Sequence, residues 1–232
     1  MRRHKINILC TRPLDSLLIY KATNSGINID EITFVETEPV LSDKIINHIK
    51  KIGTQNTVVV FTSMNAVDAV TNQLSNIPEW TIYCVGGMTK ETIFNFFGET
   101  AVAASAKNAK SLAEKIILSG NINKVVFFCG EQRLDELPQT LAANSIQVEE
   151  VIVYKTTLIP NFVVKSYNAI LFFSPSAVHS FFSDNTIATN VVLFSIGNTT
   201  TATIKTYCTN KVITSEWPGK ENMIEMVLEY YK

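Results

Sequence analysis

The sequence predicts an α/β protein of two lobes, each built around a parallel sheet. Three observations predict this fold. Short apolar runs alternate with helical stretches from end to end, these runs lack the polar alternation of half-exposed strands, and the chain contains an internal repeat. The 232 residues are 46% apolar, which is enough to fill the cores of two small domains and excludes a disordered chain.

The predicted strands are short runs rich in β-branched and apolar residues. The clearest cover residues 6–10, 32–35, 57–61, 81–85, 124–128, 148–154, 169–173 and 191–196, with weaker strands at 100–103 and 211–214. Helices are expected after most of them. In the last helix, Ile224, Val227, Leu228 and Tyr231 recur at helical spacing and predict one buried stripe.

The internal repeat appears when the chain is shifted by 111 residues. Residues 61–67 (FTSMNAV) then lie on 172–178 (FFSPSAV), with four of seven positions identical. The same shift lays 85–93 (VGGMTKETI) on 196–204 (IGNTTTATI) without a gap. Two separate matches at one shift indicate two duplicated halves.

A weaker match at a shift near 119 relates the strand ending at Cys10 to the one ending near Cys129. Each half therefore has five strand-helix units, in different chain order. The prediction is two flavodoxin-like lobes, the second circularly permuted and inserted in the first. Lobe 1 takes residues 1–36 and 160–232, lobe 2 takes 41–153, and the linkers 37–40 and 154–159 form a hinge. Pro39 and Pro160 fall at these crossings, and the strands before them predict a two-stranded connector.

Small hydroxyl residues follow several strands at the point where a helix begins: Ser63, Thr89, Ser174, Thr199 and Thr200. In open α/β sheets this carboxyl edge is where ligands bind, and helix starts offer unpaired N–H groups to carboxylate or phosphate. Simple N-capping is the alternative for each residue. A matched set from two lobes facing one cleft raises the weight of the ligand interpretation.

Composition excludes several classes of function. With 20 Lys plus Arg against 21 Asp plus Glu, no basic face for nucleic acid is expected. Neither a membrane span nor a signal peptide is expected, so the interpretation is a cytoplasmic, soluble protein. The four cysteines are dispersed and are interpreted as reduced, buried thiols, without a metal site.

Cofactor and catalytic motifs are not found. Gly86 and Gly197 lack the further glycines of a dinucleotide fingerprint, and a tight turn with positive φ is expected at each. The histidines, His4, His48 and His179, are interpreted as surface or packing residues. Basic residues near strand ends, which could together complement a polyanion, are Arg12, Lys90, Arg133, Lys155 and Lys220.

Several of these segments together resemble the uroporphyrinogen-III synthase family, whose members close hydroxymethylbilane into a macrocycle. They run in family order through nearly the whole chain: residues 61–67, 85–89, 128–138 (FCGEQRLDELP), 153–156 (VYKT), 173–177, 196–200 and the helix start at Pro218. The chain departs from the family at Pro218-Gly219-Lys220, where Pro-Thr is common, and at Gly87, which replaces a polar residue.

The resemblance implies a cofactor-independent lyase that loses water from a linear tetrapyrrole with eight carboxylates and inverts ring D. It implies that Tyr154, at the hinge facing the cleft, is the catalytic proton donor. It also implies that Ser63, Thr89, Ser174 and Thr200 bind substrate carboxylates. Thr199, Arg12, Arg133 and Lys220 complete the expected binding set. No metal is expected, and the chain is expected to be a monomer.

Two other functions remain open from the sequence. A two-lobed binding or sensor protein would close on a small anion without chemistry, although the absence of an export signal and of a DNA-binding segment counts against it. A two-lobed glycosyl transferase would need a nucleotide-sugar site that the sequence does not display. Recovery of an unchanged ligand would favour the binding protein.

Overall fold

The computed structural model describes residues 6–232, so His4 and the start of the first predicted lobe lie outside the described residues. The chain divides into two compact units, Met1–Glu36 with Thr157–Lys232 (unit 1) and Thr37–Thr156 (unit 2). These divisions fall at or inside the predicted linkers 37–40 and 154–159. The chain passes between the units through β3 (Val35–Pro39) and β8 (Gln147–Leu158), which are neighbours in one sheet.

Unit 1 contains a five-stranded sheet in the order β11-β10-β9-β1-β2. All four neighbouring pairs in it are parallel. Its strands are β1 (Ile6–Cys10), β2 (Ile27–Glu31), β9 (Ala169–Phe172), β10 (Val192–Ser195) and β11 (Val212–Thr214). Numbered along this unit alone, the order reads 2-1-3-4-5, which is the flavodoxin order.

Unit 2 repeats that order with a different chain connection. Its sheet runs β3-β8-β7-β4-β5-β6, with β4 (Val58–Phe61), β5 (Thr81–Val85), β6 (Val102–Ala106) and β7 (Lys124–Gly130). When β7 and β8 are counted as its first two strands, the order from β8 to β6 is again 2-1-3-4-5. The predicted fold class, with a circularly permuted second lobe, is therefore confirmed.

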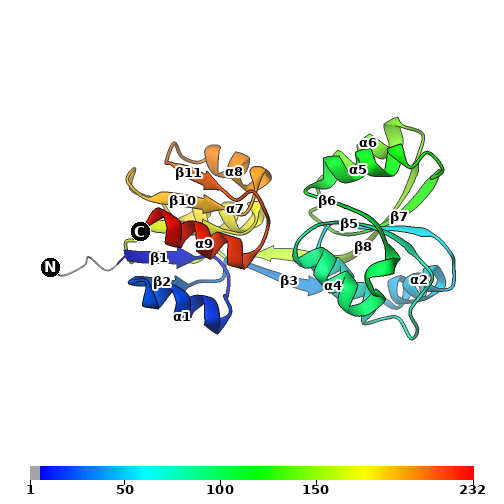
Figure 1. Cartoon of the computed structure of the whole chain (residues 1–232), viewed down its shortest axis with the longest axis horizontal. Coiled ribbons are helices and arrows are strands. Elements are labelled where there is room, and N and C mark those ends of the chain that lie inside the picture. The colour runs from blue at the N-terminus through cyan, green and yellow to red at the C-terminus, as the bar shows by residue number, and fades with distance from the viewer. Residues whose placement is uncertain (1–5) are drawn as a thin grey trace. The chain divides into compact units, whose positions relative to one another are not determined.

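Helices cover both faces of each sheet (Figure 1). In unit 1, α1 (Ser16–Asn24) and α9 (Lys220–Tyr230) cover one face, and α7 (Pro175–Asp184) and α8 (Asn198–Lys205) cover the other. In unit 2, α2 (Asp43–Gly53), α3 (Met64–Thr71) and α4 (Met88–Phe97) lie opposite α5 (Ala109–Leu118) and α6 (Glu136–Ala143). The strands are buried on both sides, as their continuous apolar runs predict.

Two predicted strands were misplaced. Residues 32–35 do not form one strand, because β2 ends at Glu31 and β3 begins at Val35. Phe34, between them, is fully buried and packs into the core of unit 1. Phe34 is therefore apolar because it packs into the core from a connecting segment, and not because it belongs to a strand. The predicted strand at 100–103 begins at Val102, after a 3₁₀ turn at Glu99–Ala101.

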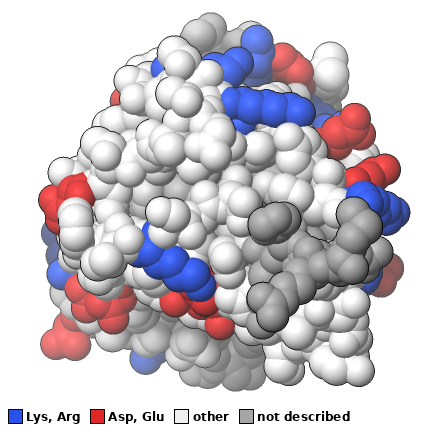
Figure 2. Space-filling model, turned by 90° about the vertical axis from the view of Figure 1, so that its left-hand side faces the viewer, with Lys and Arg blue, Asp and Glu red and all other residues white. Residues whose placement is uncertain are grey.

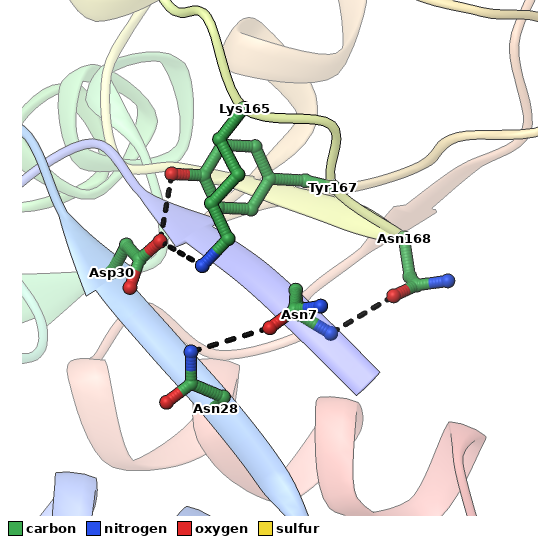
Figure 3. A network of polar contacts seen from close by, with 6 residues as sticks. All are labelled: Asn7, Asn28, Asp30, Lys165, Tyr167 and Asn168. Carbon is green, nitrogen blue, oxygen red and sulfur yellow. Dashed lines mark hydrogen bonds and ion pairs between the residues drawn. The ribbon is translucent and has the colours of Figure 1, made fainter. Parts of the chain in front are cut away.

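Unit 1 lacks the fifth helix that the repeat predicts. In unit 2 α2 leads into β4, whereas in unit 1 the matching connection, residues 159–168, contains no helix. Asp30 of β2 anchors this segment, because its carboxylate accepts hydrogen bonds from Lys165 (2.6 Å) and Tyr167 (2.9 Å) (Figure 3). The bond to Lys165 lowers the pKa of Asp30. Beside it, hydrogen bonds join three asparagines: Asn7, Asn28 and Asn168.

The glycine prediction was wrong for two positions. Positive φ is found at Gly87 (69°), directly before α4, and not at Gly86. Gly197 has φ 174°, which is extended backbone that any residue adopts. The strand-to-helix turn before α4 therefore depends on Gly87, which is one residue later than predicted.

Charge is mixed on the face seen in Figure 2, where positive and negative side chains are interspersed. This face is the side of unit 1 from which β1 starts. Among residues 6–232, no helix is both long and apolar enough to cross a membrane.

Alkaline pH is expected to destabilise the fold through buried thiols. Burial raises the pKa of Cys10 to about 12, of Cys84 to about 11 and of Cys129 to about 12, from an ordinary value of 9.0. The unfolded chain therefore loses these protons first, and stability falls as pH rises from about 9 to about 12. Urea unfolding at stepwise pH checks this. Cys10→Ala should make the fall less steep, and constant stability across this window would contradict the prediction.

Candidate active site at the carboxyl edges of the sheets

Three predicted site residues of unit 2 lie along the carboxyl edge of its sheet. Ser63 follows β4, Thr89 lies in the first turn of α4 after β5, and Tyr154 lies on β8. Because β8, β7, β4 and β5 are consecutive in a parallel sheet, their carboxyl ends form one edge. Sequence reasoning named all three residues, and the strand order explains why they share this edge.

Tyr154 is a half-buried phenol that packs against the core formed with α2, α3 and α4. Burial raises its pKa above the usual phenol range, and a hydrogen bond with the Ser63 side chain partly opposes this. The phenol is therefore protonated at neutral pH. Such a group can donate a hydrogen bond or a proton to a substrate oxygen.

Ser63 and Ser174 occupy matching positions as helix N-caps. The Ser63 hydroxyl accepts a hydrogen bond from the backbone N–H of Asn65 (3.2 Å), and that of Ser174 accepts one from Ala177 (3.1 Å). The capping alternative is therefore correct for both. A hydroxyl that accepts from the helix still has its own proton to donate, so capping does not exclude a contact with an anion.

The paired threonines lie in helix starts that have no side-chain cap. Gly87 is the N-cap of α4 and Gly197 that of α8, so neither helix start receives a side-chain hydrogen bond at its N-cap. Thr89 is only 6% exposed and Thr200 only 2%, whereas Thr199 is exposed. These helix starts therefore offer an anion mainly backbone N–H groups, with Thr199 as the accessible hydroxyl of α8.

Arg12 and Lys220 both act on the carboxyl end of β1 in unit 1. Both charges lower the pKa of the Cys10 thiol, which ends that strand, against the larger effect of burial. The Arg12 guanidinium lies over the ring of Phe173, 5.7 Å from its centroid, and the Lys220 ammonium is 3.6 Å from an Asp15 carboxylate oxygen. Two of the three basic residues of the expected binding set thus lie in the surroundings of one strand end.

Arg133, the third, already has carboxylate partners. Its Nε hydrogen-bonds a Glu150 oxygen and its Nη1 lies 3.4 Å from Asp135. The hydrogen bond with Glu150 is the main cause that raises the pKa of Arg133. A substrate carboxylate would therefore have to compete with two acids of the protein, which sequence spacing alone did not reveal.

Two features of these edges were missed from the sequence. A chain of hydroxyls, Ser195, Thr201 and Thr214, links β10, α8 and β11, with 2.6 Å between the last two oxygens. Gly130, at the end of β7, lies opposite Tyr154. The spacing of the hydroxyl residues in the sequence could have indicated the hydroxyl chain. Only the strand register reveals that Gly130 lies opposite Tyr154. Within residues 6–232 no group of His, Cys, Asp and Glu is placed to hold a metal ion.

These features define a class: a two-unit α/β protein with flavodoxin-order sheets, whose carboxyl edges carry open helix starts, basic side chains and a protonated phenol. A family model described as Uroporphyrinogen-III synthase HemD matches residues 18–225. The chain belongs to the uroporphyrinogen-III synthase family. The predicted family is therefore confirmed. Membership of this family means that the chain is an enzyme of tetrapyrrole synthesis that acts on a tetrapyrrole.

Solved structures agree in fold. A mutant uroporphyrinogen III synthase from Thermus thermophilus has a TM-score of 0.67 at 12% identity and covers 97% of each chain. The uroporphyrinogen-III synthetase from Helicobacter pylori has a TM-score of 0.65 at 17% identity and covers 97% of this chain and 99% of its own. A search of curated proteins finds no match.

Proposed function

We propose that this enzyme converts hydroxymethylbilane into uroporphyrinogen III, with loss of water and inversion of ring D, as a cofactor-independent carbon–oxygen lyase. The observation that carries the proposal is Tyr154, a half-buried phenol kept protonated at the carboxyl edge of the unit 2 sheet. This phenol supplies an acid for the one step that needs a proton, the departure of the hydroxyl.

The proposed chemistry balances without a further reactant. Electron density from the pyrrole nitrogen expels the terminal hydroxyl, the C–O bond breaks, and the proton from Tyr154 leaves with it as water. The resulting cation closes through a spiro intermediate that inverts the last ring. The proton lost when the macrocycle regains aromatic pyrroles returns to the phenolate. The protein mainly holds one folded conformer of a reactive substrate and excludes the uninverted closure.

Substrate carboxylates are proposed to bind at the open starts of α4 and α8, where two N-cap glycines leave backbone N–H groups available. Ser63, Ser174 and Thr199 add hydroxyl donors, and Arg12 and Lys220 add positive charge. Arg133 adds a further positive charge when a substrate carboxylate displaces Glu150 or Asp135 from its guanidinium. We also propose that the enzyme is a cytoplasmic monomer and has no nucleic-acid partner.

The product isomer tests the proposal. Freshly generated hydroxymethylbilane closes without inversion to the type I product, so purified protein is added to it and the two isomers are separated after oxidation. Type III product in excess is expected. Type I product alone, at the rate seen without protein, would refute the proposal.

Thr199→Val is expected to raise KM by about fivefold with little change in kcat. It removes one exposed, neutral hydroxyl of about 1 kcal/mol and keeps the backbone N–H groups of the helix start. Thr92→Val is the matched control, because the Thr92 hydroxyl bonds the Met88 carbonyl of its own helix (2.8 Å). Steady-state kinetics measures both variants, and an unchanged KM in Thr199→Val would remove this hydroxyl from the binding set.

A further inference from the structure

The register between β7 and β8 shifts by one residue next to Tyr154. Cys129 lies opposite Ile152, but Gly130 lies opposite Tyr154, so Val153 is the extra residue of a β-bulge. Bulges re-aim side chains, and here Tyr154 contacts the same core as Val153. Regular alternation would have placed these neighbouring side chains on opposite faces of the sheet.

The bulge aligns Tyr154 with the face of the sheet that carries α2 and α3. Phe61 of β4, Phe128 of β7 and Val151 of β8 lie side by side on that face. Gly130 comes two residues after Phe128 and so belongs to the same face. Its missing side chain would point where the Tyr154 ring lies.

The fit between Tyr154 and Gly130 is too close for any side chain at position 130. A Cβ atom there would lie 2.5 Å from Cζ of Tyr154, 2.7 Å from Cε2 and 2.9 Å from the phenol oxygen. Real Cβ atoms essentially never make non-bonded contacts this short, so the Tyr154 ring, which packs against the core, would have to move. The ring thus covers the backbone of β7 at its glycine.

Ser63 lies beyond that glycine along the sheet edge. The sheet order places β7 between β8 and β4, and Ser63 is the second residue after β4. The Tyr154 ring, which starts from β8, therefore lies over the middle strand, on the side toward β4. A residue larger than glycine at position 130 would occupy the space of the ring.

We propose that Gly130 is a positioning residue for the reaction: it leaves the gap in which the Tyr154 ring lies over β7, so that the phenol is held at the carboxyl edge of the sheet. This inference rests on the proposed function of Tyr154 as the proton donor. It assigns a role in catalysis to a residue that has no side chain.

The position of the ring can be measured without turnover. Protein labelled with ¹³C at the tyrosine ζ carbons is titrated by NMR, and Tyr154 is assigned by its loss in Tyr154→Phe. Gly130→Ala should lower the pKa of Tyr154 toward the ordinary phenol value of about 10, because the ring is pushed toward solvent. Gly86→Ala should leave it unchanged, because a Cβ there meets only the Ala106 carbonyl at an ordinary 3.7 Å. An unchanged Tyr154 pKa in Gly130→Ala would overturn the inference.

A double-mutant cycle identifies the group with which the added methyl group collides. Gly130→Ala should lower the urea midpoint in the native background, and in the Tyr154→Ala background it should cause little further change, because the small side chain leaves room. The test still works if Gly130→Ala alone fails to fold, because adding Tyr154→Ala should then restore folding. An equal loss of stability in both backgrounds would contradict the proposal.

Turnover links the gap to the reaction. Gly130→Ala should lower kcat about as much as Tyr154→Phe, roughly 10²-fold, and adding it to Tyr154→Phe should change kcat by no more than about twofold. A further large loss in the double variant would show a structural role alone and overturn the inference. If the wild-type protein makes no type III product, the proposed function fails, while the titration and the stability cycle still decide whether Gly130 places Tyr154.

Discussion

Replacing Tyr154 by phenylalanine is expected to lower kcat about 10²-fold, while the free energy of unfolding changes by less than about 1 kcal/mol. The substitution keeps the ring against the core of unit 2 and removes only the phenol oxygen. Loss of the acid slows departure of the hydroxyl, and binding through the carboxylates is unaffected, so KM should change little. Initial rates of product formation and urea unfolding measure both effects.

Tyr83→Phe is the matched control for this variant. Tyr83 is a buried tyrosine of β5 in the same unit, and it packs in the core on the opposite face of the sheet. It should retain the native kcat. If Tyr154→Phe keeps full turnover, the phenol is a packing group and another residue supplies the proton.

Phe128→Ala is expected to cost about 3 to 5 kcal/mol of the stability of unit 2. Phe128 is fully buried on β7, stacks on Phe61 at 5.4 Å between ring centroids and lies 5.7 Å from the ring of Trp80. Alanine leaves a cavity that strands fixed on both sides cannot close. Urea unfolding followed by tryptophan fluorescence of Trp80 reports the loss.

Leu118→Ala controls for the loss of a large apolar side chain in the same unit. Leu118 ends α5 and is 83% exposed, so its removal should change stability by less than about 0.5 kcal/mol. A similarly small cost for Phe128→Ala would contradict a rigid core beneath the carboxyl edge of this sheet.

Much of the fold was predictable because the repeat supplied long-range information that local propensity lacks. Matching residues 61–67 to 172–178 identified β4 with β9, and the permuted strand order followed. The repeat failed where the two halves differ. The connection at 159–168 is held by Asp30, Lys165 and Tyr167 instead of a helix, and no local pattern distinguishes such a segment from a short helix.

The candidate site was predictable in residue type but not in detailed contacts. Ser63, Thr89 and Tyr154 do lie along one edge, since the carboxyl ends of parallel strands share it. The burial of Thr89, the carboxylates around Arg133 and the gap at Gly130 were not predictable. Each depends on the register and packing of strands far apart in sequence, and the bulge at Val153 cannot be read from alternation alone.

We expect the tetrapyrrole to bind at the carboxyl edge where Tyr154 lies. The ¹³Cζ NMR signal of Tyr154 during anaerobic titration with uroporphyrinogen III tests this, with the signal of Tyr83 as internal reference. The Tyr154 signal should shift in a saturable way while that of Tyr83 stays in place. Saturable binding that leaves the Tyr154 signal unmoved would show that the tetrapyrrole binds elsewhere.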